Sequence, residues 1–494
     1  MNLHSLSILR RQNHKENRRL TAVHVSDHYM TNSMHMNRRC LQALLLCSAV
    51  FLSISSVPRT TFAQSKGDLE NAYVGLGTGM PQYQIFEIGV VQQGDTASQG
   101  FGASPGGIGV GRSVRASGAQ AFSWTQAGGI VGLPNLAGRA FCVSNSANDA
   151  GAVVGTCAST LFGTSRLPTV WQNGIVTQLP LPNGETLGDA NDVNSAGVAV
   201  GSINSGSLQR AVVYSGGTAT PITQTTGSGC FFTTAFGVND AGRVIGPGID
   251  PNNAARNVGM VLDIGSGTAF EVGALPGMNG ALPFGISNAG HVVGSSMLNQ
   301  GSGLPFIWTQ GGGMVEIPLP VGTSQASARA VNSSGWAVGT ASSAFAIPFV
   351  YNGSQTLRLA DLIPAGTGWD LSTNTSSSAL GISDGGVIVG TGVLNGQIRA
   401  YAMVPVLANV SVTGRVLTSS GAGIRNVMVT ASGGDLQAPV NAFTSSFGYF
   451  SFPNLRATLT YTITVTPRKF AIAQPTRQIT PATNVTNFDF IAEP

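Results

Sequence analysis

The chain has 494 residues, which is too long for one ordinary domain unless it is built from repeats. Its formal net charge is +4, but residues 1–64 hold eight of the 25 Lys and Arg and only two of the 21 Asp and Glu. Residues 65–494 therefore carry 17 positive and 19 negative charges. This balance excludes a strongly basic surface, so nucleic acid is not an expected partner.

The first 82 residues have the pattern of a leader and a linker. Residues 36–63 place two arginines before an apolar run and end in Thr-Phe-Ala, as in a secretory signal peptide. We expect residues 1–35 to lie upstream of the true start, cleavage near Ala63, and a linker over 64–82. The apolar run is too short for a permanent membrane span. The mature protein is thus expected to be a monomer without a membrane span, secreted or held at the cell surface or in the periplasm.

One short phrase occurs seven times after this leader. Each copy starts 44 to 51 residues after the previous one, and a period of this length is typical of a propeller or a solenoid. The copies, which define repeat units 1 to 7, are ASPGGIGVG (103–111), ANDAGAVVG (147–155), VNSAGVAVG (193–201), VNDAGRVIG (238–246), ISNAGHVVG (286–294), VNSSGWAVG (331–339) and ISDGGVIVG (382–390).

The phrase predicts a tight hairpin. Asn or Ser opens the turn and can bond its own backbone, and Gly accepts a positive φ at the end of the turn. A second strand–Gly turn–strand pattern follows in units 1 to 6, for example PFIWTQGGGMVEI at 305–317, so each of these units offers four short strands. The aromatic residues of the third strand are expected to pack between units rather than to bind a ligand; they are Trp124, Trp171, Tyr214, Trp308 and Tyr351.

The two ends of the repeat array complement each other. Unit 7 stops after its third strand, RAYAM at 399–403, and the strand-like segment YQIFEIGV at 83–90 precedes unit 1. An N-terminal strand that completes the last unit would close a ring and remove exposed sheet edges, whereas a solenoid would have capped ends. We therefore predict an all-β chain with a seven-bladed β-propeller over 83–404, closed by its N-terminal strand.

The repeat units resemble the HAF-type extracellular repeat of bacterial exported proteins. The Asn-x-x-Gly phrase and the Ala-Phe-x-Trp sequence at 121–124 carry this resemblance, which covers all seven units. Members of that family often begin the second phrase with His-Ala-Phe, but this chain has Gln120, Arg210 and Arg399 at the first of these positions. The resemblance implies export and a repeat architecture, and it implies no active site.

Residues 405–494 have a different pattern. Period-two alternation in NVMVTA, GYFSF and YTITVTP indicates short strands of a small antiparallel β-sandwich. The sequences V-x-G-x-V (412–416), G-I-x-x-V-x-V (423–429) and S-x-x-G-x-F-x-F-x-x-L (445–455) resemble the carboxypeptidase regulatory-like, transthyretin-type domain. The resemblance implies a module grouped with carbohydrate-binding-like folds, although a fold alone does not establish sugar binding.

Residue types that carry catalysis are scarce after the leader. His291 is the only histidine beyond residue 36. A histidine-based zinc site or Ser–His catalysis would therefore have only this one histidine to use. We predict no catalytic residues, no metal site and no cofactor. Cys142 and Cys157 flank a hairpin turn and are expected to form a cross-strand disulfide, the alternative being two buried thiols; Cys230 has no evident partner.

Four residues are candidates for ligand binding. After the turn glycine, units 4, 5 and 6 carry Arg243, His291 and Trp336 where the other units have Ile, Ala or Val. Consecutive units would place these three in an arc that could hold a carboxylate or a sugar ring; the alternative is three solvated strand residues. Trp369 lies in the longest spacing between units, and long loops on rigid scaffolds often carry function.

Three functions remain open from the sequence. The first is an exported non-enzymatic binding or scaffold protein whose partner is a glycan or a surface protein. The second is a carbohydrate-active lyase or hydrolase with the tail as an accessory module, which would need a pair of inward carboxylates. The third is a structural component of the cell surface or of adhesion.

Overall fold

A computed structural model describes residues 82–493, except 161–164, 206–207, 254, 299–302, 407, 435, 437, 458, 468 and 482. The described part is all-β: it consists of strands and one short 3-10 helix, η1 (Leu359–Leu362), and it contains no α-helix. No helix in this part is long and apolar enough to cross a membrane. The predicted start, signal peptide, cleavage site and linker up to residue 81 lie outside the described residues.

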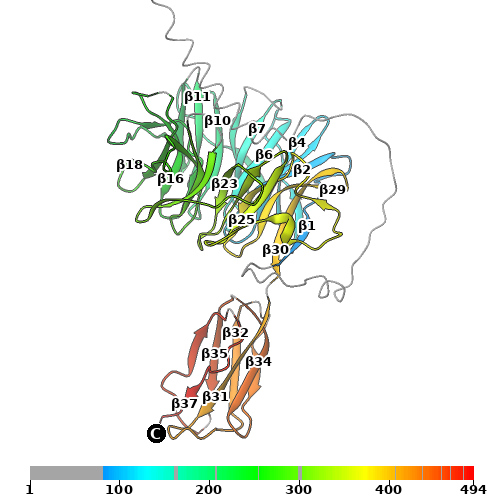
Figure 1. Ribbon diagram of the computed structural model, residues 1–494. Coiled ribbons are helices and arrows are strands. Elements are labelled where there is room, and N and C mark those ends of the chain that lie inside the picture. The colour runs from blue at the N-terminus through cyan, green and yellow to red at the C-terminus, as the bar shows by residue number, and fades with distance from the viewer. Residues whose placement is uncertain are drawn as a thin grey trace, which may run out of the picture. The chain divides into compact units, whose positions relative to one another are not determined.

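Units 1 to 3 form antiparallel sheets in chain order (Figure 1). A single parallel pair, Ala119 and Phe141, joins units 1 and 2 into one eight-stranded sheet. Unit 1 contains β2 (Ala97–Ala103), β3 (Gly109–Arg115), β4 (Gly118–Thr125) and β5 (Gly129–Gly132). Unit 2 contains β6 (Phe141–Ala147), β7 (Val153–Ala158), β8 (Leu167–Gln172) and β9 (Ile175–Gln178). Unit 3 contains β10 (Leu187–Val193), β11 (Ala199–Ser205), β12 (Leu208–Ser215) and β13 (Thr218–Pro221).

Units 4 to 6 repeat this arrangement, and in unit 4 the first strand is split in two. Unit 4 contains β14 (Phe231–Phe232), β15 (Gly237–Val238), β16 (Arg243–Ile249), β17 (Val258–Asp263) and β18 (Thr268–Glu271). Unit 5 contains β19 (Gly280–Ile286), β20 (Val292–Met297), β21 (Gly303–Thr309) and β22 (Gly313–Glu316). Unit 6 contains β23 (Gln325–Val331), β24 (Ala337–Ser342), β25 (Ala346–Tyr351) and β26 (Thr356–Arg358).

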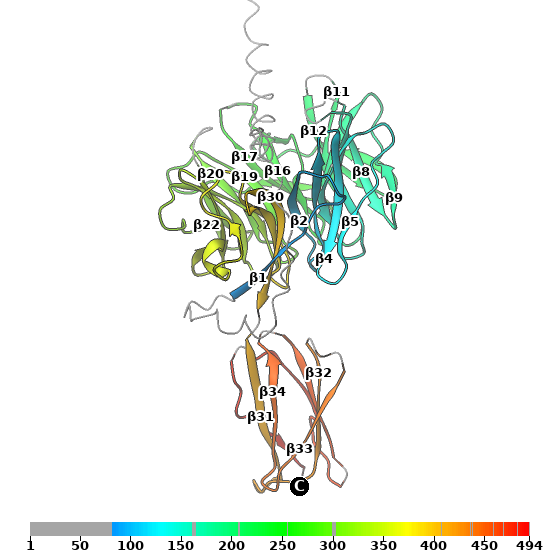
Figure 2. The same cartoon turned by 90° about the vertical axis from the view of Figure 1, so that its right-hand side faces the viewer.

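Unit 7 receives a strand from the start of the described chain. It contains β27 (Trp369–Asp370), β28 (Ser378–Ile382), β29 (Ile388–Leu394) and β30 (Gln397–Val406), and β1 (Gln82–Glu87) lies antiparallel to β30 (Figure 2). Ile85 pairs with Met403, and the Ile88 amide continues the contact by donating to the Ala400 carbonyl. The predicted pairing of the two ends is present. The strand ends at Glu87 rather than Val90, and β27 was not predicted.

A bulge in the first strand explains the last glycine of the repeated phrase. In every unit except the fourth, the register between first and second strands slips by one residue. Seven glycines face the first strand there, and a methyl group on any of them would lie 1.8 to 2.1 Å from a carbonyl oxygen of that strand; they are Gly111, Gly155, Gly201, Gly246, Gly294, Gly339 and Gly390. The final Gly is therefore required by the close approach of two backbones.

The third-strand aromatic residues are core residues, as expected. Trp124, Trp171, Tyr214, Trp308 and Tyr351 are at most 8% exposed. Trp171 belongs to a cluster that also contains Val110 and Ala121 of unit 1, and its indole nitrogen donates to the Pro134 carbonyl at 2.7 Å. Packing between units thus accounts for these side chains.

The tail, residues 409–493, contains two sheets that share one hydrophobic core. One sheet has the order β34-β31-β37 and the other β33-β32-β35-β36. The core takes Val412 and Phe450 from the first sheet and Val429 and Ile463 from the second. The strands are β31 (Asn409–Leu417), β32 (Met428–Gly433), β33 (Val440–Phe443), β34 (Tyr449–Arg456), β35 (Tyr461–Thr466), β36 (Thr476–Ile479) and β37 (Phe490–Ile491).

The tail differs from the sequence prediction in two respects. β33 and β36 were not predicted, because each is four residues long and mostly exposed. The prediction of a purely antiparallel domain was wrong, since β37 runs parallel to β31. The chain reaches β37 by a connection from β36, which belongs to the other sheet, and no local sequence signal fixes the direction of such a crossover.

Candidate functional site

The first residue of each turn closes its own hairpin. The side chains of Asn148, Asn194, Asn239 and Asn332 accept a hydrogen bond from the amide four residues later, at 2.9 to 3.0 Å. In units 1, 5 and 7 a serine hydroxyl accepts the same bond, from Ile108, His291 and Val387. This local role agrees with the turn chemistry expected from the sequence.

The asparagines also bond the next unit, which the sequence did not reveal. Asn148 donates its side-chain N–H to the Asn194 carbonyl, Asn194 to that of Asn239, and Asn239 to that of Ser287. Asn332 donates to Ser383 in the same way. Serine is shorter than asparagine, and the described turns of units 1, 5 and 7, which carry Ser at this position, show no such link. The repeated phrase therefore ties neighbouring sheets together as well as turning the chain.

The second turn position makes further links. The Ser195 amide donates to Asp240 Oδ1 at 2.8 Å, and the Ser333 amide donates to Asp384 Oδ1 at 2.8 Å. The Asp384 amide in unit 7 donates to the Pro105 carbonyl in unit 1 at 2.8 Å. The turns of the last and first units are thus in direct contact, and these turns make up one surface of the repeat region, called the turn face below.

The predicted arc residues lie along the turn face and lean onto the next unit. A methyl group on Gly290 would lie 3.4 Å from Arg243 Nη1, and one on Gly335 would lie 3.5 Å from His291 Nε2. Arg243 also donates to Gln310 Oε1 at 2.6 Å. Trp336 packs against the buried cluster that contains Tyr83. The three side chains therefore occupy successive grooves between units, instead of converging on one open cavity.

Trp369 does not join the arc. It pairs with Leu394, at the opposite end of β29 from the turn of unit 7. Its ring lies edge-on to Tyr401 at 5.8 Å and covers Gly392. Trp369 thus lies at the other end of β29 from the turn of unit 7, although it packs against the same buried cluster as Trp336.

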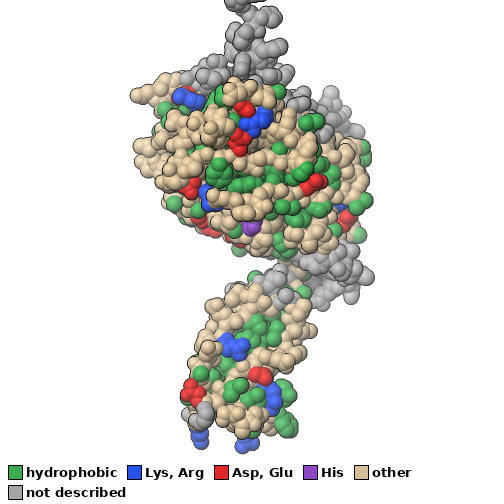
Figure 3. Space-filling model, turned by 60° about the vertical axis from the view of Figure 1, so that its left-hand side comes forward, with side chains coloured by type: hydrophobic (Ala, Val, Ile, Leu, Met, Phe, Trp, Pro, Cys, Tyr) green, Lys and Arg blue, Asp and Glu red, His purple; other side chains and the backbone are tan. Residues whose placement is uncertain are grey.

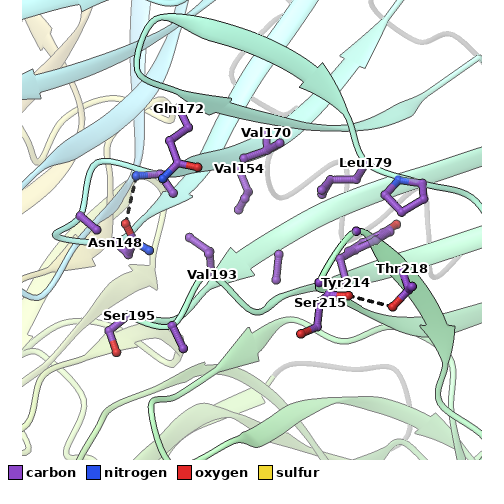
Figure 4. Close-up of a pocket in the computed structure, with 18 residues that line it drawn as sticks. Asn148, Val154, Val170, Gln172, Leu179, Val193, Ser195, Tyr214, Ser215 and Thr218 are labelled. Carbon is purple, nitrogen blue, oxygen red and sulfur yellow. Dashed lines mark hydrogen bonds between the residues drawn. The ribbon is translucent and has the colours of Figure 1, made fainter.

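An open groove lies between units 2 and 3 on the turn face (Figure 4). Unit 2 has Ala152 at the position that holds Arg243 or His291 in later units, and nothing lies within 4 Å of a methyl group built on Gly197. Because Ala152 is short, the groove between units 2 and 3 stays open, whereas Arg243 and His291 fill the equivalent grooves between later units. The groove can therefore be recognised in the sequence by the small residue that unit 2 carries at this repeat position.

The groove has an apolar floor and a neutral polar rim. Val154 and Val170 of unit 2 face Val193 and Tyr214 of unit 3 (Figure 4). Tyr214 is 2% exposed, and burial raises the pKa of its phenol above the usual range. The rim consists of Asn148, Gln172, Ser195, Ser215 and Thr218. The lining contains no Asp, Glu, His, Lys, Arg or Cys, so this surface offers hydrogen bonds and apolar contact rather than acid–base chemistry.

One half-buried carboxylate joins three units beside this groove. Asp192 stands where the other units have Gly, Ser or Ala. It accepts hydrogen bonds from the Ser146 hydroxyl at 2.6 Å and from the Val238 amide at 2.8 Å. Burial raises the pKa of Asp192 to about 6, against the opposing effect of these hydrogen bonds. The sequence analysis missed this residue, although its deviation from the repeat was visible.

Cys230 lies in the most highly charged cluster of unit 4. Arg256 donates to Asp250 Oδ2 at 2.8 Å, to Glu271 Oε2 at 2.5 Å and to Cys230 Sγ at 3.3 Å. The hydrogen bonds from Arg256 hold the pKa of Glu271 below its usual range. Both carboxylates are thereby paired and ionised, which suits a structural role. Among the described residues, no group of three His, Cys, Asp or Glu side chains is placed to hold a metal ion.

Cys142 and Cys157 face each other across β6 and β7. Their sulfurs are joined in a disulfide that closes a segment with a sequence separation of 15 residues. Cys230 is buried and is the free cysteine of the described chain. The disulfide spans the hairpin of unit 2, whose turn carries Asn148 at the rim of the groove.

A search of curated proteins finds no match to the sequence. Several solved structures have a similar fold over part of the chain. Virginiamycin B lyase from Staphylococcus aureus, in an inactive variant with quinupristin, is 13% identical; the match covers 66% of this chain and 100% of that one, with a TM-score of 0.41. Oligogalacturonate lyase from Vibrio parahaemolyticus is 10% identical, with coverages of 66% and 97% and a TM-score of 0.43.

A gluconolactonase from Xanthomonas campestris is 11% identical, with coverages of 66% and 92% and a TM-score of 0.34.

The family comparison concerns the tail. Residues 411–492 match the model of the carboxypeptidase regulatory-like domain, so the chain contains a domain of this family, as the sequence patterns of the tail predicted.

Proposed function

We propose that the chain is an exported, non-enzymatic binding protein, built from a closed seven-bladed β-propeller of the HAF-repeat type and a β-sandwich tail. The pairing of β1 with β30 and the bond from Asp384 to Pro105 support closure of the ring. Its partner is a glycan or a surface protein, and it acts as a monomer after cleavage near Ala63. The sequence of residues 36–63 supports export.

The groove between units 2 and 3 is the proposed binding site. The observation that carries this proposal is its lining: an apolar floor with amide and hydroxyl groups at the rim, and no ionisable group besides the buried Tyr214. Such a lining can hold the hydroxyls and C–H faces of a neutral sugar, or a short uncharged peptide segment, without transforming them. The carboxylate pair that the enzyme alternative requires is not found in this lining.

A filled groove tests the proposal. Ala152→Trp introduces the side chain that unit 6 carries at this repeat position, so the fold should accept it while the groove closes. On an array of neutral and acidic glycans, the full chain should bind a set of neutral glycans and the variant should lose them by more than tenfold. Ile108→Trp, at the same position in unit 1, is the matched control and should bind normally.

Four other outcomes would indicate another site or another function. Equal binding by the wild-type protein and Ala152→Trp would place the site elsewhere, and loss of binding in the combined Arg243→Ala, His291→Ala and Trp336→Ala variant would place it on the arc. Release of unsaturated or hydrolysed products from any glycan on the array would support the enzyme alternative. Absence of binding to glycans and to surface proteins would support a purely structural role.

A further inference from the structure

The tail exposes a cluster of rings and cations on the outer face of the sheet β34-β31-β37. Phe447, in the turn before β34, is 70% exposed, and Tyr449 is 53% exposed. Tyr449 pairs with Arg415 across the strands, and Leu417 pairs with the 59% exposed Ile491. Residues paired across strands share a face, so Arg415, Leu417, Tyr449 and Ile491 lie together. We call these four residues and Phe447 the tail patch.

The Arg415 guanidinium is held in place within the tail patch. Its Nε and Nη2 atoms both donate to the Phe447 carbonyl at 3.1 Å, and its central carbon lies 4.9 Å from the centre of the Tyr449 ring. A guanidinium has five N–H groups, so three remain for another acceptor. The nearby Asp489 carboxylate accepts from the Arg415 backbone amide at 2.7 Å. The guanidinium is thus fixed before any ligand arrives.

Charge in the tail is distributed differently from charge in the repeat region. The six ion pairs found among the described residues all lie in the repeat region. The tail sequence from residue 408 holds six Lys and Arg but three Asp and Glu. Arg425, which is exposed, lies two residues after Gly423, and Gly423 is packed directly against Phe447. A second cation thus follows a backbone segment that contacts the tail patch, and two arginines in this part of the tail favour an anionic ligand.

We propose that the tail patch binds an acidic polysaccharide, with uronate carboxylates on Arg415 and Arg425 and pyranose C–H faces on Phe447 and Tyr449. A polyuronate presents an apolar ring face and a carboxylate on every residue, which matches alternating rings and cations on a rigid sheet. The exposed rings favour a polyuronate over a simple polyanion, because a simple polyanion has no ring face to contact them. This inference rests on the proposed binding function but uses a surface separate from the groove.

Alginate, a polyuronate, is the probe for this site. The full chain should bind alginate, and Phe447→Ala and Arg415→Gln should each weaken binding at least tenfold. Arg415→Lys should fall between the wild-type protein and Arg415→Gln, because lysine keeps the charge but loses the planar pair of bonds to the Phe447 carbonyl. Phe443→Ala removes another exposed ring, 58% exposed on the opposite sheet, and should change binding less than twofold.

Competing ligands make the result decisive. In the Ala152→Trp variant, whose groove is filled, neutral dextran should bind at least tenfold more weakly than alginate. Polyglutamate, which has carboxylates but no pyranose rings, should also bind at least tenfold more weakly. Equal binding of polyglutamate, binding of phosphatidylglycerol vesicles without binding of alginate, or normal alginate binding by Phe447→Ala would each overturn the proposal. Ala152→Trp should leave alginate binding unchanged, so failure at the tail patch is distinguishable from failure at the groove.

Discussion

The repeat region and the tail are both all-β and both have buried apolar clusters, but in the repeat region side-chain hydrogen bonds between units are added to the apolar packing. In the repeat region, side-chain amides and carboxylates of the turns bond the backbone of the neighbouring unit, and charged groups form ion pairs. Its surface shows a few positive and negative side chains, some of them side by side, among many uncharged ones (Figure 3). The tail instead has one apolar core shared by two sheets, and its Arg415 and Arg477 donate to backbone carbonyls and lie over aromatic rings.

This difference explains the contrasting sequences. Within each unit, the first two strands approach so closely at one point that only Gly fits. Neighbouring units then meet through buried side chains such as Trp171 and through hydrogen bonds of a few turn residues. The tail tolerates more variation, because a core of about the right volume and pattern folds with many apolar side chains.

The largest effect should come from a methyl group at one of these close approaches, between β10 and β11 of unit 3. Gly201→Ala would place a carbon 1.8 Å from the Asp189 carbonyl oxygen, so we expect the repeat region to lose more than about 4 kcal/mol of unfolding free energy. All five tryptophans lie in the repeat region, so urea unfolding followed by tryptophan fluorescence measures it. Gly311→Ala, where nothing lies within 4 Å, is the control; equal stability of both variants would refute the steric account.

Loss of the disulfide should have the next largest effect. A loop of about 15 residues contributes roughly 3 kcal/mol in the chain-entropy account, and Cys142 and Cys157 close one with a sequence separation of 15. The double variant Cys142→Ala/Cys157→Ala should lower the fluorescence transition by this amount and leave amide hydrogen exchange in the tail unchanged. A reducing agent should reproduce the loss in the wild-type protein; no response to the agent would contradict the bridge.

Acid should stabilise the repeat region through Asp192. Its folded-state pKa of about 6 lies above the ordinary value of 3.8, so the folded protein holds a proton that the unfolded chain releases first. Stability contributed by this group is therefore full below about pH 4 and falls as the pH rises toward 6 and above. The difference between wild type and Asp192→Asn should change by about 2–3 kcal/mol from pH 4 to pH 7. A parallel pH dependence of both proteins would contradict the burial of a titrating carboxylate.

The smallest effect should come from one link between turns. Asn194→Ser keeps an acceptor for the Val198 amide but loses the donation to the Asn239 carbonyl. We expect a loss of about 1–2 kcal/mol in the fluorescence transition, because a buried carbonyl loses its partner. Ser287→Asn is the reverse change, since it supplies the donor that unit 5 lacks, and it should stabilise the protein or be neutral. A large loss in Ser287→Asn would show that the links depend on more than the side-chain donor.

Local patterns in the sequence were enough to predict strands, turns and the order of units. The Asn-x-x-Gly phrase, the period of 44 to 51 residues and the incomplete last unit pointed to the β1–β30 pairing, and the alternation in the tail pointed to β31, β32, β34 and β35. Each phrase and each alternating segment consists of a few consecutive residues, and the repetition of the phrase gives the order of the units. The third-strand aromatics were assigned to the core for the same reason.

Contacts between units were decided only in the folded molecule. The sequence singled out Arg243, His291 and Trp336 as large, but only the structure shows that they fill grooves and that Ala152 leaves one open. It likewise reveals the bonds from Asn194 and Asp192 to neighbouring units and the parallel direction of β37. Each of these depends on a contact between residues that are some 45 or more positions apart in the chain. Local sequence patterns do not show which distant residues meet.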